Sequence, residues 1–214
     1  MEVLNGFRIS TEHWDTALSN GHLVYLIAND DSHDATDVTD VAVRFTMINA
    51  PENTAEHLIQ ALENGNAIGV RFPRKSDESL EQKIKRMENE IPYITQVELR
   101  DDTLLISASK TILKIKFIGQ NGKELDIQQN KKTAKYVVQP EDNYVRSEIM
   151  FKGGTTLYLN PITRHESDEI VKQRLDKINY PKTIILWTIY VFVILFVVKM
   201  IRKKLKSKQE NIEN

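Results

Sequence analysis

Cysteine is missing from this chain of 214 residues. Its absence excludes disulfides, zinc sites with thiolate ligands and cysteine nucleophiles. Any metal site must therefore use histidine, aspartate and glutamate, which suit hard or borderline ions such as Mn, Mg, Zn or Fe. An excess of positive charge is missing too, because the formal net charge is -1. Without a basic field we do not expect nucleic acid as a partner.

The N-terminus lacks the apolar segment of a signal peptide, and the long apolar run lies near the C-terminus instead. Residues 183–198 carry no charge, and the run extends to residue 201 when Lys199 is included. A helix needs about 20 such residues to cross the ~30 Å hydrocarbon core of a bilayer. We therefore predict a single transmembrane helix over residues 183–201 that contacts membrane lipid. The alternative is a buried core helix.

The charges that flank this run predict its orientation. The tail, residues 202–214, begins with the basic sequence RKKLKSK. The positive-inside tendency puts such a tail in the cytoplasm and the soluble part outside it. The bias is incomplete, since basic residues also precede the run. The alternative is a tail anchor with the soluble part inside.

Residues 23–34, LVYLIANDDSHD, join a short apolar run to a group of polar and titratable side chains. The apolar part predicts a strand buried on both faces, as in parallel sheets. Active sites of α/β folds lie at the C-terminal ends of such strands. Asp31 and His33 are two positions apart, so a continued strand would point both side chains to one face. Together they are reasonable ligands for a divalent ion, and the alternative is a solvated loop.

The pattern of strands and helices changes along the soluble part. Residues 1–75 predict strand, helix, strand, strand, helix and strand, which is an α/β pattern. Residues 76–92 predict a charged linker or surface helix. Residues 93–164 predict strands at about ten-residue spacing, which favours a small antiparallel β-sandwich. A polar stalk is expected over residues 165–182.

Four segments carry a resemblance to a known family. WDTALSNGHLVYLIANDDSHD resembles the last metal motif of the polymerase and histidinol phosphatase (PHP) superfamily. INAPENTAEHLIQALENGNAIGV resembles the family's next segment, and YVRSEI and LNPITR resemble the sheet appended to such enzymes. The resemblance covers residues 2–164. It implies a distorted (β/α)7 barrel with divalent ions at the C-terminal ends of its strands, of which residues 1–75 are the C-terminal part.

The resemblance also implies an activity and a set of site residues. The activity is metal-dependent hydrolysis of a small phosphate ester, and the metal ligands are Asp31 and His33. One interpretation of Asp30 is that it orients His33, and the other is that it caps a local turn. One interpretation of Arg146 is that its planar fork binds phosphate, and the other is an ion pair with a neighbouring glutamate.

The family's His-x-His motif and its middle His and Glu ligands are absent from this sequence. Two ligands do not make a catalytic site. The remaining histidines are expected at the surface: His13, His22, His57 and His165. We therefore expect the C-terminal part of a membrane-anchored phosphoesterase, inactive alone, rather than a decayed copy. The alternative is a non-catalytic, membrane-tethered binding or assembly module.

Overall fold

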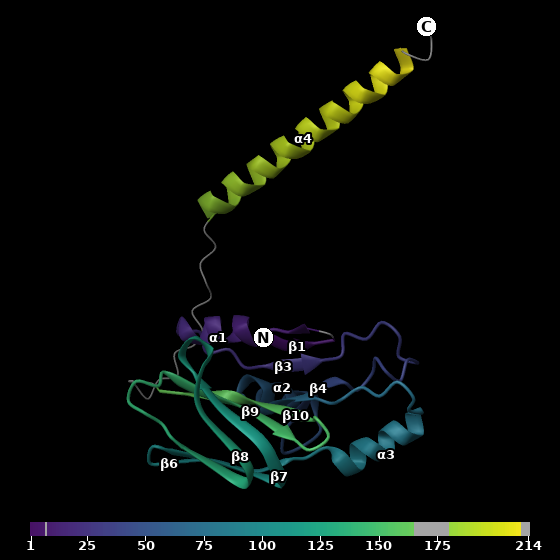
Figure 1. The fold of residues 1–214 in the computed structure, drawn as a ribbon. Coiled ribbons are helices and arrows are strands. Elements are labelled where there is room, and N and C mark those ends of the chain that lie inside the picture. The colour runs from purple at the N-terminus through teal and green to yellow at the C-terminus, as the bar shows by residue number, and fades with distance from the viewer. Residues whose placement is uncertain (7, 165–179, 211–214) are drawn as a thin grey trace. The chain divides into compact units, whose positions relative to one another are not determined.

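The computed structural model describes residues 1–6, 8–164 and 180–210. The chain forms two compact units, Met1–Val171 and Lys172–Asn214. The first unit contains both sheets of the described part, and the second contains a long apolar helix (Figure 1).

A small sheet opens the first unit. Its strand order is β2-β1-β3, with β1 at Glu2–Asn5, β2 at Arg8–Ile9 and β3 at Ile27–Asn29. β1 pairs antiparallel with β2 and parallel with β3. Helix α1, Thr11–Ser19, lies between β2 and β3 in the chain, so the parallel pair is linked through a helix.

The prediction of a strand buried on both faces was wrong. β3 begins only at Ile27, whose side chain is 39% exposed, while its neighbours Leu26 and Ala28 are 1% and 5% exposed. The small sheet is covered on one face, where Leu26 and Ala28 pack in a cluster with Trp14, Tyr144 and other apolar residues. A sheet covered on one face buries alternate residues only.

A second, larger sheet supplies most of the unit. It has the strand order β4-β5-β10-β9-β7-β6, and β8 pairs with β7. All of its strand pairs are antiparallel. It curls into a half-barrel around an apolar core (Figure 1). Its strands are β4 at Arg44–Ile48, β5 at Ala67–Arg71, β6 at Ile94–Arg100, β7 at Thr103–Gly119, β8 at Lys123–Val137, β9 at Tyr144–Phe151 and β10 at Thr156–Thr163.

The mixed α/β prediction is confirmed in this coarse form, and a (β/α)7 barrel is not shown. β4 and β5 belong to residues 1–75, yet they share one sheet with strands of residues 93–164. β5 pairs with β4 along one edge and with β10 along the other, where Val70 lies opposite Leu157. Local periodicity carries no information about such a distant partner, so an α/β part and a separate sandwich were expected instead.

The remaining helices of this unit lie where the local signals placed them. α2 follows the predicted start near Pro51, and Thr54 caps it by accepting a hydrogen bond from the backbone N–H of His57. α3 begins with a capping box in which Ser79 and Gln82 satisfy each other's backbone N–H groups. Their bounds are α2 at Ala55–Glu63, α3 at Leu80–Glu90 and the 3-10 turn η1 at Gln120–Gly122.

The second unit contains helix α4, Tyr180–Glu210. In the described part, this is the one helix long and apolar enough to cross a membrane, over Tyr180–Lys203. The predicted span, residues 183–201, falls inside it. Residues 165–179 of the predicted stalk and residues 211–214 of the tail lie outside the described residues.

Candidate functional site

A hollow of about 510 Å³ lies at the carboxyl ends of the parallel strands β1 and β3. The ends of these strands approach closely at Gly6, whose backbone N–H donates to the carbonyl of Asn29 over 3.2 Å. Gly6 has φ +40°, and a Cβ there would lie 3.0 Å from the carbonyl oxygen of Asp30. The lining residues are Glu2, Asn5, Gly6, Arg8, Ser10, Asp30, Asp31, His33 and Asp40.

Asp31 and His33 both line this hollow, but not as a continued strand. β3 ends at Asn29, and Asp31 adopts the left-handed backbone with φ +49°. The side chain of Asn29 stabilises this turn by accepting from the backbone N–H of Asp31 over 3.0 Å. The premise that a regular strand aligns the two side chains was therefore wrong, because the chain turns before Asp31. Both residues are exposed.

Asp30 closes the base of the following loop, which we call the acidic loop, residues 30–41. Its carboxylate accepts hydrogen bonds from the backbone N–H groups of Ala42, Val43 and Arg44, at 2.7 Å for Val43 and 2.6 Å for Arg44. A carboxylate that binds backbone in this way acts as a cap. Its geometry therefore favours the turn-capping interpretation over an orienting role toward His33.

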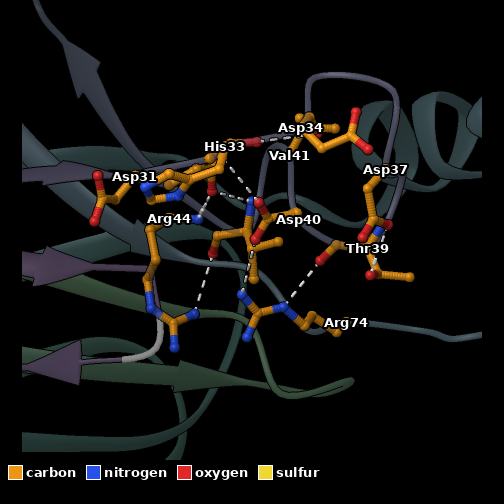
Figure 2. Close-up of polar contacts among 12 residues, drawn as sticks. Asp31, His33, Asp34, Asp37, Thr39, Asp40, Val41, Arg44 and Arg74 are labelled. Carbon is orange, nitrogen blue, oxygen red and sulfur yellow. Dashed lines mark hydrogen bonds and ion pairs between the residues drawn. The ribbon is translucent and has the colours of Figure 1, made fainter.

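Asp34, Asp37 and Asp40 of the acidic loop bind the loop's own backbone (Figure 2). Asp34 accepts from Thr36, whose hydroxyl holds the pKa of Asp34 below its ordinary value. Asp37 accepts in the same way from Thr39. The Oδ2 atom of Asp40 accepts from the backbone N–H of His33 over 3.4 Å. In Figure 2 the carboxylate of Asp31 points away from Asp34, Asp37 and Asp40.

Two basic side chains hold the far end of the acidic loop. Lys83 of α3 is 2% exposed and donates through Nζ to the carbonyls of Val38, at 2.5 Å, and Val41. Burial lowers the pKa of Lys83. Arg74 donates to the carbonyl of Thr39 over 2.9 Å. The loop is therefore fixed at both ends, and its first residues after Asp30 include the exposed Asp31 and His33.

Asp31 and His33 have the donor chemistry of a Mn, Zn or Fe site. No group of three or more His, Asp or Glu side chains in the described part is arranged to hold a metal ion. Catalytic zinc sites use three protein ligands and an open position. The described residues therefore do not by themselves fit a complete metal centre.

Arg146 lies elsewhere, in a group that we call the Asp15–Arg146 cluster: the buried Asp15, Tyr144 and Arg146 and the partly exposed Glu148. The guanidinium of Arg146 binds both carboxylate oxygens of Asp15, each at 2.7 Å, and Glu148 at 2.6 Å. Arg146 is 3% exposed and does not line the hollow. Its position favours the ion-pair interpretation over phosphate binding.

Asp15 is the residue that sequence reasoning missed. It also accepts from the hydroxyl of Tyr144 over 2.9 Å. Burial raises the pKa of Tyr144 to about 12. Because Asp15 and Arg146 are 131 positions apart, no local pattern links them. The one available signal was the neighbouring Trp14, which marks the buried face of α1.

Comparison of the chain with protein-family models, curated proteins and solved structures finds no match. The function of the hollow must therefore be inferred from its lining residues, from the sequence around Asp31 and His33, and from its location at the carboxyl ends of the parallel strands β1 and β3.

Proposed function

We propose that this chain is one part of a membrane-anchored, PHP-type metal-dependent phosphoesterase, to which Asp31 and His33 supply two metal ligands. The observation that carries the proposal is their presence in one hollow at the carboxyl ends of β1 and β3. This is where α/β folds gather catalytic groups. The remaining ligands must come from outside the described residues, because those residues do not complete the site.

The small sheet is compatible with this proposal. Within the described residues, β1 pairs on one edge with β3 and on the other with the two-residue strand β2 alone. A further parallel strand would take that second edge in a closed barrel. We therefore interpret β1, α1 and β3 as the last unit of a (β/α)7 barrel.

The role of this chain's own residues in such a site is limited to binding and positioning. Asp31 and His33 would hold the ion, which supplies a Lewis acid and an activated water when bound. Asp30 and Asp40 fix the backbone on which these two residues sit. No reaction step follows from the described residues alone.

Metal binding by the full chain in nanodiscs tests the site. We expect Mn²⁺, followed by electron paramagnetic resonance, to bind weakly, and Asp31→Ala and His33→Ala each to reduce that binding. Asp77→Ala and His13→Ala are matched controls, since both residues are exposed and neither lines the hollow. Mn²⁺ binding that is equal in all four variants would contradict the proposal.

Activity and gene context test the claim that the site is partial. The 214-residue chain should not hydrolyse a generic phosphomonoester. An in-frame His-x-His segment is expected upstream of Met1, and the longer product should lose its turnover on Asp31→Ala. A stop codon and a ribosome-binding site directly before Met1, or turnover by the 214-residue chain that Asp31→Ala abolishes, would overturn it.

The membrane part of the proposal concerns orientation. Basic residues such as Arg202 and Lys203 follow the apolar run, which favours a cytoplasmic tail and an extracytoplasmic soluble part. Because the chain has no cysteine, Ser76→Cys and Ser207→Cys each create a single label site. A membrane-impermeant maleimide should label intact cells at residue 76 only. Labelling at residue 207 only would reverse the orientation.

The second candidate function is a non-catalytic, membrane-tethered binding or assembly module. One observation favours it: Asp30, Asp34, Asp37 and Asp40 all accept hydrogen bonds from backbone N–H groups in the acidic loop or directly after it. A loop stabilised in this way has a structural use for most of its acids. Mn²⁺ binding that does not depend on Asp31 or His33 would favour this candidate.

A further inference from the structure

The apolar inner face of the half-barrel extends to β6, where it is exposed to solvent. Val97 and Leu99 of β6 lie directly opposite Ile106 and Leu104 of β7. Directly opposite residues of an antiparallel pair point to the same face of the sheet. Ile106 and Leu104 are 1% and 2% exposed, whereas Val97 and Leu99 are 51% and 53% exposed. The core face is therefore left without cover at its last strand.

The backbone of β6 is equally open. β6 pairs with β7 along one edge, and within the described residues no strand pairs with its other edge. Because alternate residues of a strand direct their N–H and C=O groups to opposite edges, half of these groups face the open side. An exposed edge of this kind is a template for pairing with another strand.

A groove runs beside this edge, between β6 and the strands β4, β5 and β10. It encloses about 650 Å³, and its apolar lining includes Met47, Ile68, Val97 and Leu159. None of the residues that line it is charged, although 28% of the chain is charged. A separate cavity of about 200 Å³ beside Leu99 shares Ile162 with it, and the charged residues Asp102, Asp142 and Arg164 are part of its lining. We call the larger cavity the β6 groove.

We infer that the β6 groove binds an extended, uncharged peptide segment of a partner protein, which adds to β6 as a further strand. Backbone hydrogen bonds to the open edge would supply affinity, and alternate apolar side chains would cover Val97 and Leu99. The uncharged lining selects against charged side chains, since burying a charge without a partner is costly. The inference is independent of the proposed metal site, because no residue lines both cavities.

The test uses the full chain in nanodiscs and a blocked heptapeptide of alternating valine and threonine, as long as the seven-residue β6. Binding is measured by isothermal titration calorimetry. Val97→Lys should weaken binding at least about tenfold, because it places a charge without a partner in the uncharged groove. Glu98→Gln is the matched control, since the intervening residue of a strand points to the opposite face.

A second measurement leaves the protein unchanged. Two versions of the peptide carry N-methyl groups on alternate residues, so that each version loses the N–H donors of one edge. One version should lose binding at least about tenfold and the other should keep it, because only one edge pairs with β6. This comparison holds even if a lysine variant fails to fold.

Three results would overturn the inference. The first is no binding of the peptide at about 1 mM, the weak end of specific affinity. The second is equal binding of both N-methylated peptides. The third is dimerisation of the chain in sedimentation experiments that Val97→Lys abolishes, since the open edge would then belong to a second copy.

Discussion

The carboxylates of Asp15, in the Asp15–Arg146 cluster, and Asp31, in the acidic loop, differ in burial and in hydrogen bonding. Asp15 is 6% exposed, and both of its oxygens receive hydrogen bonds from side chains of β9. Asp31 is exposed near the start of the acidic loop, whose other acids bind backbone N–H groups. The first carboxylate is fully used by the fold, while the second is free of the core and open to a ligand.

The difference follows from the cost of burying charge. A carboxylate and a guanidinium leave water only if their mutual geometry is good and their other hydrogen bonds are satisfied. The paired contacts between Arg146 and Asp15 meet this condition, with Glu148 taking a third donor. A charged residue in a buried, fully bonded setting therefore indicates a structural role.

Asp15→Ala should have the largest effect on stability. It leaves the charge of Arg146 buried beside Trp14 without its main partner, which costs about 3–5 kcal/mol. Urea denaturation followed by circular dichroism measures the loss. Arg100→Ala, which removes an exposed ion pair with Glu98, is the control and should leave the midpoint unchanged. A loss no larger than that of the control would contradict a structural role.

Asp30→Ala should have a smaller and more local effect. It leaves three backbone N–H groups without their acceptor, and an unsatisfied buried donor costs about 1–3 kcal/mol. Amide hydrogen exchange at Val43 and Arg44 should speed up. Asp34→Ala is the control, and it should leave exchange at these two residues unchanged. Equal exchange in both variants would refute the cap.

Tyr144→Phe removes one donor to Asp15 and should cost about 1 kcal/mol at neutral pH. Because the pKa of Tyr144 is raised from 10.0 to about 12 in the fold, its contribution is complete below pH 10 and is lost as pH rises through about 12. Tyr144→Phe should therefore lose less stability between pH 10 and 12 than the parent. Tyr93→Phe, which changes a tyrosine that is 63% exposed, should keep the parent's slope.

Asp31→Ala and His33→Ala should have the smallest effect on folding, because both side chains are exposed. Their melting temperatures should match that of the parent. Any loss should be confined to Mn²⁺ binding in the assay described above. A large drop in melting temperature would show that these two residues stabilise the fold as Asp15 does, and it would contradict the difference proposed between Asp31 and Asp15.

Some elements could be predicted because their signals are local. The apolar spacing after Pro51 predicted α2, and strand-forming residues predicted β9 close to its bounds. The uncharged run near the C-terminus predicted α4. In each case the signal is the periodicity of the element itself and the residues that flank it, so no distant contact is needed.

The candidate site was predictable in its residue types and not in its geometry. Asp31 and His33 do share a hollow, but the strand turns at Asn29 because Asp30 binds the backbone of residues 42–44. That contact closes a loop whose ends are more than ten positions apart. The alternation of apolar and polar residues reports only on near neighbours in the chain and cannot reveal such a contact. The prediction of a strand that continues to His33 was therefore wrong.

The amino-acid sequence alone establishes which chemical groups are available: no thiolate, a carboxylate and an imidazole two positions apart, and an apolar run long enough to span a bilayer. Which carboxylate is buried and which is exposed depends on how the chain folds. The tertiary structure also joins β5 to β10, binds Asp15 to Arg146, and leaves the edge of β6 without cover. These features depend on burial and hydrogen bonding between residues far apart in the chain, which exist only after the chain has folded.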